Sequence, residues 1–348
     1  MTKTDQRSIG VWLLGVALMT FVMVILGGVT RLTGSGLSMV DWQPVTGFLP
    51  PLSDEAWRDA FNMYKKSPEF IKVNFWMTLS DFKSIYWMEF IHRVWGRAIG
   101  IAFLLPCIYF MARRRIGARL MPKLIFAFIL GGLQGVLGWY MVKSGLVDRP
   151  DVSQYRLAAH LGLAIVIYLY LLWLALNLFV PRGKSGAKFA LNGLRTYAGV
   201  IMFWAFTTAT WGAFVAGIDA GHTYNTFPLM GDHFVPDDMF SLEPWLINFF
   251  ENAATVQFTH RILAISLWLI VIGFWVCAMR GPAHGRIRLA SSILAVVATC
   301  QVGLGIATLL SDVMIEIAAS HQAGALLLLT CAIWAMFETF PTLDPGRY

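Results

Sequence analysis

The chain has 348 residues, of which 57% are hydrophobic and only 14% are charged, and its formal net charge is +7. Soluble domains carry about a quarter charged residues, so this composition excludes a soluble protein and predicts an all-α integral membrane protein. The net positive charge does not indicate a nucleic-acid partner, because in a membrane protein the placement of the basic residues carries the information. We expect contact with membrane lipid and no nucleic acid.

A helix needs about 20 mostly apolar residues to cross the hydrocarbon core of a bilayer. Eight segments of this chain meet that requirement. They lie at residues 11–30, 88–110, 122–142, 156–180, 196–217, 254–279, 287–310 and 314–338. Lys3 and Arg7 precede the first segment and no small-residue cleavage site follows it, so we expect a membrane helix there rather than a secretory signal peptide.

The basic residues predict the orientation of these eight spans. With the N-terminus in the cytoplasm, the inner segments hold 15 of the 27 Lys and Arg residues but only three of the 20 Asp and Glu residues. Cytoplasmic loops carry an excess of Lys and Arg. We therefore expect both termini to be cytoplasmic, with a bacterial inner membrane as the location. Two long segments, about 31–86 and 218–253, then lie on the outer side, which suggests that the outer face is the functional one.

The two halves of the chain resemble each other. The matching stretches are 89–93 and 257–261, 134–138 and 301–305, and 158–162 and 319–324, with Gly27, Gly28 and Gly36 matched by Gly212 and Gly221. Each half has four spans, so both halves enter the membrane from the same side and the axis that relates them runs along the membrane normal. We predict two pseudo-symmetric four-helix bundles, an N-terminal half at 1–180 and a C-terminal half at 196–340.

Four of the seven histidines fall at repeat-related positions inside the spans. They are His92, His160, His260 and His321. Each lies on a span that runs from outside to inside, on the order of 10 Å below the outer surface at 1.5 Å of rise per residue. The other three, His222, His233 and His284, lie in connecting segments, where we expect solvated surface side chains.

Polar groups at a shared depth in the membrane tend to mark function. Neutral imidazole is the commonest metal ligand, and two imidazoles on facing helices can hold a haem iron from both sides. A zinc or copper centre would need thiolate or carboxylate ligands that each half lacks. The four cysteines show no CxxC spacing, which excludes covalent c-type haem. The pattern therefore favours two non-covalent haem sites, one in each half, over histidines that only join helices by hydrogen bonds.

Several arginines near these histidines are candidates for binding haem propionates, because a guanidinium pairs with a carboxylate through two hydrogen bonds. They are Arg31, Arg93, Arg97 and Arg261. The alternative is that these long side chains extend to the lipid headgroups.

One acidic residue distinguishes the two halves. Glu89 precedes His92 by three residues, so both side chains lie on one face of a helix. The matching residue before His260 is Gln257, which cannot take up or release a proton. A carboxylate one turn from a haem ligand can transfer protons or stabilise positive charge, so the first half is predicted to carry out chemistry and the second to hold a resident cofactor. The alternative is a Glu that complements the helix dipole.

The combined pattern resembles the haem A synthase family over nearly the whole chain. The resemblance rests on the stretch GGVTRLTGSGLS from Gly27 to Ser38, on Glu89-x-x-His92-Arg93 and on the later histidines. It implies an eight-span oxidoreductase that converts the methyl group at ring position 8 of haem O to a formyl group, giving haem A for terminal oxidases.

The resemblance also implies roles for single residues. His260 and His321 match the ligands of a resident b-type haem, His92 and His160 match the residues that hold haem O, and Glu89 matches the catalytic glutamate. A haem O synthase is the expected supplier of the substrate, and the electron acceptor is unidentified. Some members carry a cysteine pair in the first outer loop, which this chain lacks, so the resemblance does not extend to a mechanism that requires that pair. With its long first outer loop, the chain resembles the proteobacterial and mitochondrial branch.

Two other functions compete with this one. A dihaem b-type electron-transfer subunit linked to a quinol explains the four histidines equally well but gives Glu89 no role. A transporter with a histidine proton relay predicts a protein without haem absorbance.

Overall fold

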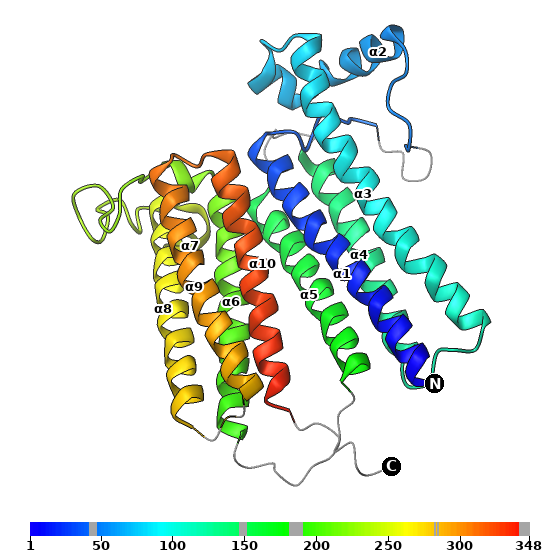
Figure 1. The fold of residues 1–348 in the computed structure, drawn as a ribbon. Coiled ribbons are helices and arrows are strands. Elements are labelled where there is room, and N and C mark those ends of the chain that lie inside the picture. The colour runs from blue at the N-terminus through cyan, green and yellow to red at the C-terminus, as the bar shows by residue number, and fades with distance from the viewer. Residues whose placement is uncertain (42–46, 146–151, 181–190, 282, 284, 341–348) are drawn as a thin grey trace.

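The computed structural model describes residues 1–41, 47–145, 152–180, 191–281, 283 and 285–340. Eight of its helices are long and apolar enough to cross a membrane (Figure 1). They are α1 (Lys3–Leu32), α3 (Leu79–Ala112), α4 (Met121–Gly145), α5 (Gln154–Phe179), α6 (Asn192–Gly217), α8 (Ala253–Arg280), α9 (Gly285–Leu310) and α10 (Ile315–Glu338). The described residues contain no β-strand. The prediction of an all-α, multi-pass membrane protein with eight spans is therefore confirmed.

Two membrane helices begin earlier than predicted, at positions where N-terminal capping residues occur in the sequence. α1 begins at Lys3 because Thr2 and Asp5 form a capping box. α3 begins at Leu79, nine residues before the predicted start at 88, because Thr78 and Asp81 form another. With 34 residues, α3 is about 51 Å long, which exceeds a hydrocarbon core of about 30 Å. Its first turns project beyond the ends of the other membrane helices (Figure 1), where they support the segment that precedes them.

That preceding segment contains α2 (Asp54–Tyr64) and a short π-helix (Phe70–Asn74), which project beyond the ends of the other helices (Figure 1). Trp57 and Phe61 of α2 pack on Phe82 and neighbouring aromatic rings of α3. We call residues 47–78 the cap, and the end of the bundle that carries it the cap face. The cap is thus held on α3 by an aromatic core of its own.

The membrane helices pack in two groups. One apolar core is built mainly from α1, α3, α4 and α5, and a second mainly from α6, α8, α9 and α10. The groups meet where α1 packs on α10 and α5 packs on α6. Residues 218–252 cover the second group at the cap face, with the short helices η2 (Ala220–His222), η3 (Trp245–Ile247) and α7 (Asn248–Glu251) (Figure 1). Each group therefore has a connecting segment above it on the same face.

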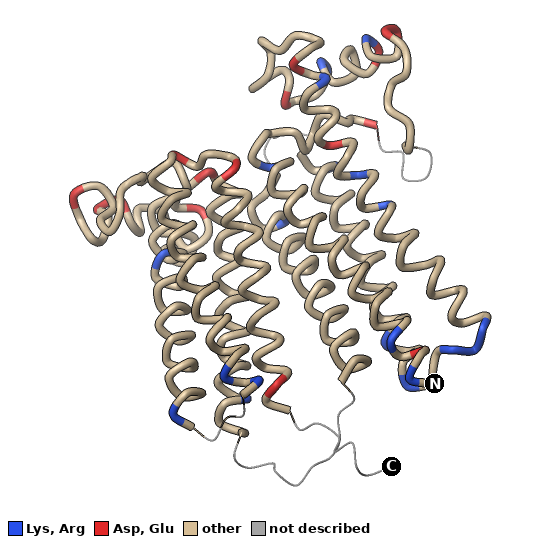
Figure 2. Tube along the Cα trace, in the orientation of Figure 1, with Lys and Arg blue, Asp and Glu red and all other residues tan. Residues whose placement is uncertain are grey.

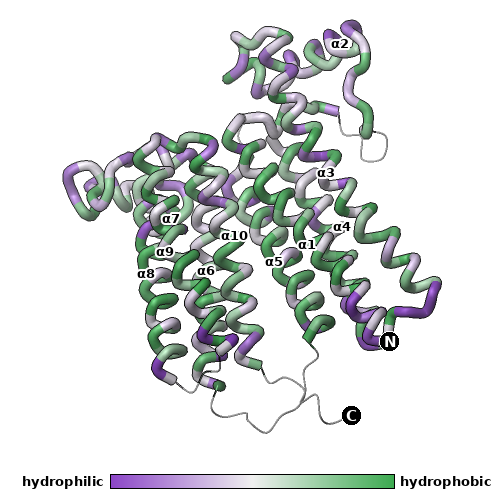
Figure 3. The backbone as a smooth tube through the Cα atoms, viewed as in Figure 1, coloured by the Kyte–Doolittle hydropathy of each residue, from purple (hydrophilic) through white to green (hydrophobic). Residues whose placement is uncertain are grey.

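Charged residues lie mainly at the two ends of the helix bundle, and hydrophobic residues lie between them. Lys and Arg gather at the end where α1 begins, whereas most Asp and Glu residues lie at the cap face (Figure 2). Between these ends the helices are largely hydrophobic (Figure 3). This is the distribution that the positive-inside rule associates with a cytoplasmic N-terminus.

The end of α1 turns the chain back toward α3. Thr33 caps the helix and Gly34 follows with φ of +60°, a left-handed conformation that glycine adopts without strain. The Gly34 N–H donates to the Arg31 carbonyl and the Ser35 N–H to the Thr30 carbonyl, which is a Schellman motif. This turn directs Ser38 and the residues after it against the side of α3.

Candidate functional site

The four intramembrane histidines share one packing arrangement, in which each ring lies against a glycine of the preceding membrane helix. A methyl group on Gly27 or Gly212 would lie 3.3 Å from the Cε1 atom of its histidine, on Gly138 3.0 Å and on Gly305 2.9 Å. The pairs are Gly27 with His92, Gly138 with His160, Gly212 with His260, and Gly305 with His321. A side chain at these glycines would push the ring away, so the glycines of the sequence repeat are positions that the histidine rings require.

Hydrogen bonds fix the orientation of three of these rings through Nδ1. The His92 Nδ1 atom lies 3.1 Å from the Thr30 hydroxyl. Gln134 Nε2 lies 3.2 Å from His160 Nδ1 and donates to the His160 carbonyl at 3.0 Å. Gln301 repeats this arrangement at His321, at 3.1 and 2.9 Å. In histidine metal sites a partner that accepts from one ring nitrogen orients the other toward the metal. The Thr30 hydroxyl can accept in this way from His92 Nδ1, whereas the amide groups of Gln134 and Gln301 are donors that hold their rings in position.

The separation of one histidine pair matches a haem iron. The ring centroids of His260 and His321 lie 6.5 Å apart with the rings at 86° to each other. Two histidine–metal bonds of about 2 Å in line, with half an imidazole ring at each end, span roughly 6–7 Å. His260 and His321 are therefore spaced so that an iron ion could be held between them. His92 and His160 are likewise close enough to interact electrostatically.

Glu89 is buried, with only 3% of its surface exposed, and three donors surround its carboxylate. The Ser38 hydroxyl and the Met39 N–H both donate to Oε2 at 2.7 Å. Arg93, one turn along α3, donates to Oε1 and also to the Met39 carbonyl at 2.9 Å and the Asp41 carbonyl at 3.3 Å. The segment that follows α1 is thereby tied to α3 by an anionic group with a buried cation beside it.

The second half repeats this arrangement, except that the direction of one hydrogen bond is reversed: the side chain donates to the backbone instead of accepting from it. Gln257 Nε2 donates to the Tyr224 carbonyl at 3.1 Å, and Gln257 Oε1 accepts from Arg261 at 3.3 Å. Arg261 also donates to the carbonyls of Tyr224, Thr226 and Leu229. Where the first half offers an N–H and a hydroxyl to a carboxylate, the second offers a carbonyl to an amide. The contrast between Glu89 and Gln257 therefore extends to the backbone around them.

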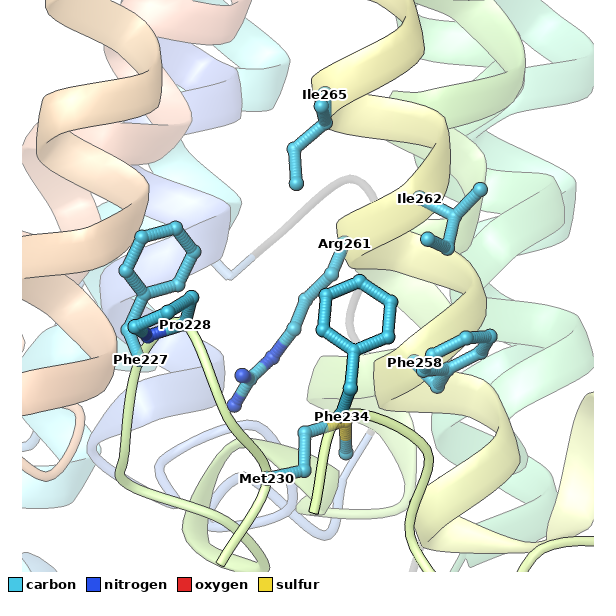
Figure 4. A pocket seen from close by; sticks show the side chains of 8 residues that line it. All are labelled: Phe227, Pro228, Met230, Phe234, Phe258, Arg261, Ile262 and Ile265. Carbon is cyan, nitrogen blue, oxygen red and sulfur yellow. The ribbon is translucent and has the colours of Figure 1, made fainter. Parts of the chain in front are cut away.

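The predicted propionate-binding arginines lie in different surroundings. Arg93 and Arg261 contact the backbone above each histidine pair, as described. The Nε atom of Arg261 is buried without a hydrogen-bond partner, and its side chain reaches into a shallow apolar groove between α8 and the segment 227–234 (Figure 4). Arg97 lies over the ring of Phe48 in the cap. Arg31 contacts the second half, donating to the Ala216 carbonyl at 2.9 Å and to Asp219 at 3.1 Å.

The remaining histidines and the cysteines are outside this site. His222 and His233 are exposed and pair with Asp312 and Asp237, as expected for surface residues. His284 lies outside the described residues. The four cysteines, at positions 107, 277, 300 and 331, are free thiols.

Some residues of the site were not predicted from the sequence. Thr30 and Ser38 lie in the stretch after the first glycine pair, and Gln134 and Gln301 begin the second repeated motif. The two glutamines occur at matched positions of the repeat, and each precedes by four residues a glycine that contacts a histidine ring. A spacing of four places the glutamine and the glycine on one helix face, so the sequence did contain a signal that these glutamines lie near the histidines. No comparable signal pointed to Ser38, because its contact with Glu89 depends on how the chain turns after α1.

Comparisons with known proteins identify the family of this chain. The sequence profile of the family COX15-CtaA, described as cytochrome oxidase assembly protein, matches residues 10–333. The chain is 49% identical to the heme A synthase of Nitrosospira multiformis, over 97% of this chain and 96% of that protein. It is 48% identical to the heme A synthase of Parvibaculum lavamentivorans, over 96% and 94%, and 46% identical to the heme A synthase COX15 of Bos taurus, over 97% and 83%. This chain belongs to the COX15-CtaA family of cytochrome oxidase assembly proteins.

Proposed function

We propose that this protein is a haem A synthase, an oxidoreductase that converts the position-8 methyl group of haem O to the formyl group of haem A. Family membership and the similarity to heme A synthases over nearly the full chain support this function. The alternative of a dihaem electron-transfer subunit has no support from these relatives. The observation that carries the proposal within the chain is the pairing of Glu89 with one histidine pair and of Gln257 with the other.

The two halves have different tasks in this proposal. The C-terminal half at 196–340 holds haem b between His260 and His321, and the N-terminal half at 1–180 holds haem O between His92 and His160. Haem b, when bound, supplies a one-electron relay that takes electrons from the substrate toward an electron acceptor. The glycine contacts and the 6.5 Å spacing of the His260 and His321 rings support this assignment. Arg93 and Arg261 are the propionate candidates that follow His92 and His260 directly in the sequence.

Glu89 is the proposed catalytic base. Two successive two-electron oxidations of the methyl group give an alcohol and then a hydrated aldehyde, and losing water from the latter leaves the formyl group. Each oxidation releases protons that a nearby base must accept. Glu89 lies one turn from His92 on α3, is buried, and is paired with Arg93. Its position and charge thus fit a group that removes protons from the reacting carbon or from attacking water.

The location in the membrane follows from the same arrangement. We infer a bacterial inner membrane, with cytoplasmic termini and with the haem sites toward the outer side. The basic residues at the end where α1 begins, and the acidic residues at the cap face, support this orientation (Figure 2). Haem O then comes from a haem O synthase in the same membrane.

The test is the conversion of haem O to haem A in membranes that contain the wild-type protein, Glu89→Gln or Gln257→Glu. We expect Glu89→Gln to bind both haems but to lose conversion by about 10²-fold or more, as for loss of a general base. Gln257→Glu is the matched control and should retain conversion. Full activity of Glu89→Gln would overturn the role of Glu89, and loss of haem from that variant would make the residue structural.

A further inference from the structure

The Ser38 hydroxyl has two acceptors within reach. Its Oγ atom lies 2.7 Å from Glu89 Oε2 and 3.3 Å from the Ile85 carbonyl oxygen, one turn earlier on α3. Ser38 is buried, with 2% of its surface exposed. A serine hydroxyl has one hydrogen to donate and two lone pairs that accept, and it rotates to suit its neighbours. The single hydrogen can therefore point at Glu89 or at Ile85, and the oxygen is free to accept in the second case.

We infer that Ser38 is a positioning residue that keeps Glu89 hydrogen-bonded both before and after it takes up a proton. With Glu89 as a carboxylate, Ser38 donates to Oε2. When a proton arrives at Oε2, the new O–H donates to Ser38 Oγ, and the Ser38 hydrogen turns to the Ile85 carbonyl. One proton is added to Oε2 and no other covalent bond changes. This inference rests on the proposed role of Glu89 as the base.

The other groups that contact the carboxylate cannot make this change. The Met39 N–H and the Arg93 guanidinium are donors only, so both favour the charged form of Glu89. A buried acid surrounded by such donors alone would hold its negative charge and resist protonation. Ser38 differs because it can accept as well as donate. Among the three groups that contact the carboxylate, Ser38 is therefore the one that can stay hydrogen-bonded to Oε2 once a proton is there.

The second half lacks this device at the matched position. Counting from Gly36 and Gly221, Thr223 corresponds to Ser38 and Tyr224 to Met39. Thr223 is exposed, and Gln257 bonds to the Tyr224 carbonyl. An amide does not change its protonation state, so a hydroxyl that can reverse its role has no task there. A buried hydroxyl that can both donate and accept, Ser38, is therefore found beside the acid Glu89 and not at the matched position beside Gln257.

Other titratable groups surround Glu89. Arg93 and Tyr86 on α3 and Tyr64 on α2 interact electrostatically with its carboxylate or with each other. His92 follows one turn later on α3. Burial is the main cause that raises the pKa of the Tyr64 phenol, followed by the neighbouring Glu69, with the smallest contribution from the Glu89 charge. Tyr64 thus stays neutral during the reaction and leaves Glu89 as the group that takes up the proton.

The experiment compares Ser38→Ala, Ser38→Thr and Ser38→Cys in the full-length protein loaded with haem, with Thr223→Ala as the matched control. It measures haem content, kcat and KM for haem O conversion across pH, and the infrared carbonyl stretch of a protonated carboxyl group. We expect Ser38→Ala to keep its haem and its KM, to lose kcat by about tenfold, and to move the acidic limb of the pH–rate profile upward, because the carboxylate has lost a donor. Ser38→Thr should restore the wild-type profile.

The outcomes separate this inference from the proposed function. A wild-type pH profile for Ser38→Ala, or a Thr variant that behaves like the Ala variant, would overturn the role of the hydroxyl while Glu89→Gln remains inactive. An active Glu89→Gln would overturn the proposed function instead. If Ser38→Ala does not accumulate with haem, the test uses Ser38→Cys instead. A thiol is a weak donor, so the acidic limb of the pH–rate profile should move upward in this variant as well, but by less. An unshifted carboxyl band and pH profile in Ser38→Cys would then contradict the inference.

Discussion

Arg31 at the end of α1 donates through Nε and Nη2 to the carbonyl of Ala216 at the end of α6, at 3.1 and 2.9 Å. Counting from Gly27 and Gly212, Ala216 is the residue that matches Arg31 in the other half. The two halves therefore meet at equivalent points of the repeat. A second link lies deeper in the membrane, where Gln322 of α10 donates to the Val24 carbonyl of α1 at 2.8 Å.

Replacing Arg31 by alanine should weaken this junction between the halves. The variant removes the charged donor of the half-buried Ala216 carbonyl, and a hydrogen bond to a charged group contributes about 1.5–3 kcal/mol. We expect a lower thermal unfolding temperature in detergent, with both haems retained. Asp219→Asn is the control, since the Asp219 carboxylate is 70% exposed and such ion pairs contribute about 0–1 kcal/mol. Loss of haem at unchanged stability would instead support the predicted contact of Arg31 with a propionate.

A methyl group at the glycines beside the histidines should displace the rings. In Gly305→Ala the new Cβ would lie 2.9 Å from His321 Cε1, and overpacking of this kind costs about 1–3 kcal/mol. We expect roughly tenfold weaker retention of haem B, measured by titration of the haem-depleted protein. Gly303→Ala is the matched control because nothing lies within 4 Å of its Cβ position. Equal losses in both variants would contradict the packing role of Gly305.

Gln301 and Gln134 should support different haems. Gln301→Leu removes the group that lies 3.1 Å from His321 Nδ1, and loss of such a ligand-orienting partner commonly lowers metal affinity about 10- to 100-fold. We expect this variant to bind haem B weakly and to change its reduction potential, whereas Gln134→Leu should affect haem O alone. Redox titration of the purified variants makes the comparison. A change of haem B potential in Gln134→Leu would contradict the assignment of the halves.

The cap should depend on a buried polar cluster under its aromatic rings. The Tyr64 hydroxyl donates to Glu69 at 2.9 Å and accepts from Asn74 at 2.8 Å. Tyr64→Phe removes both bonds and should destabilise the cap by about 1–3 kcal/mol. We expect faster limited proteolysis within residues 47–78 while haem B is retained. Met63→Ala, at a half-exposed neighbour, is the control, and equal proteolysis of both variants would contradict a specific role of the hydroxyl.

The sequence predicted the features that depend on local pattern. Apolar length identified the eight spans, and the repeated histidines and glycines identified positions that lie together in the structure. The start of α3 was placed nine residues too late because the hydrophobic pattern ends at the membrane surface, whereas the capping box of Thr78 and Asp81 extends the helix beyond it. The contact of Arg31 with the end of α6 was not predicted, because the direction of a long side chain depends on the packing of distant helices. The contact of Ser38 with Glu89 depends on a turn that the sequence does not specify by itself.

The central claim is that the two histidine pairs hold different haems. The most direct test is chromatography of pigments extracted by acid-acetone from the purified wild-type protein, from His92→Ala with His160→Ala, and from His260→Ala with His321→Ala. The account predicts haem B together with haem O or haem A in the wild type. The first double variant should lose haem O and haem A but keep haem B, and the second should lose haem B. Haem B alone at two per chain, reduced equally by both double variants, would contradict it.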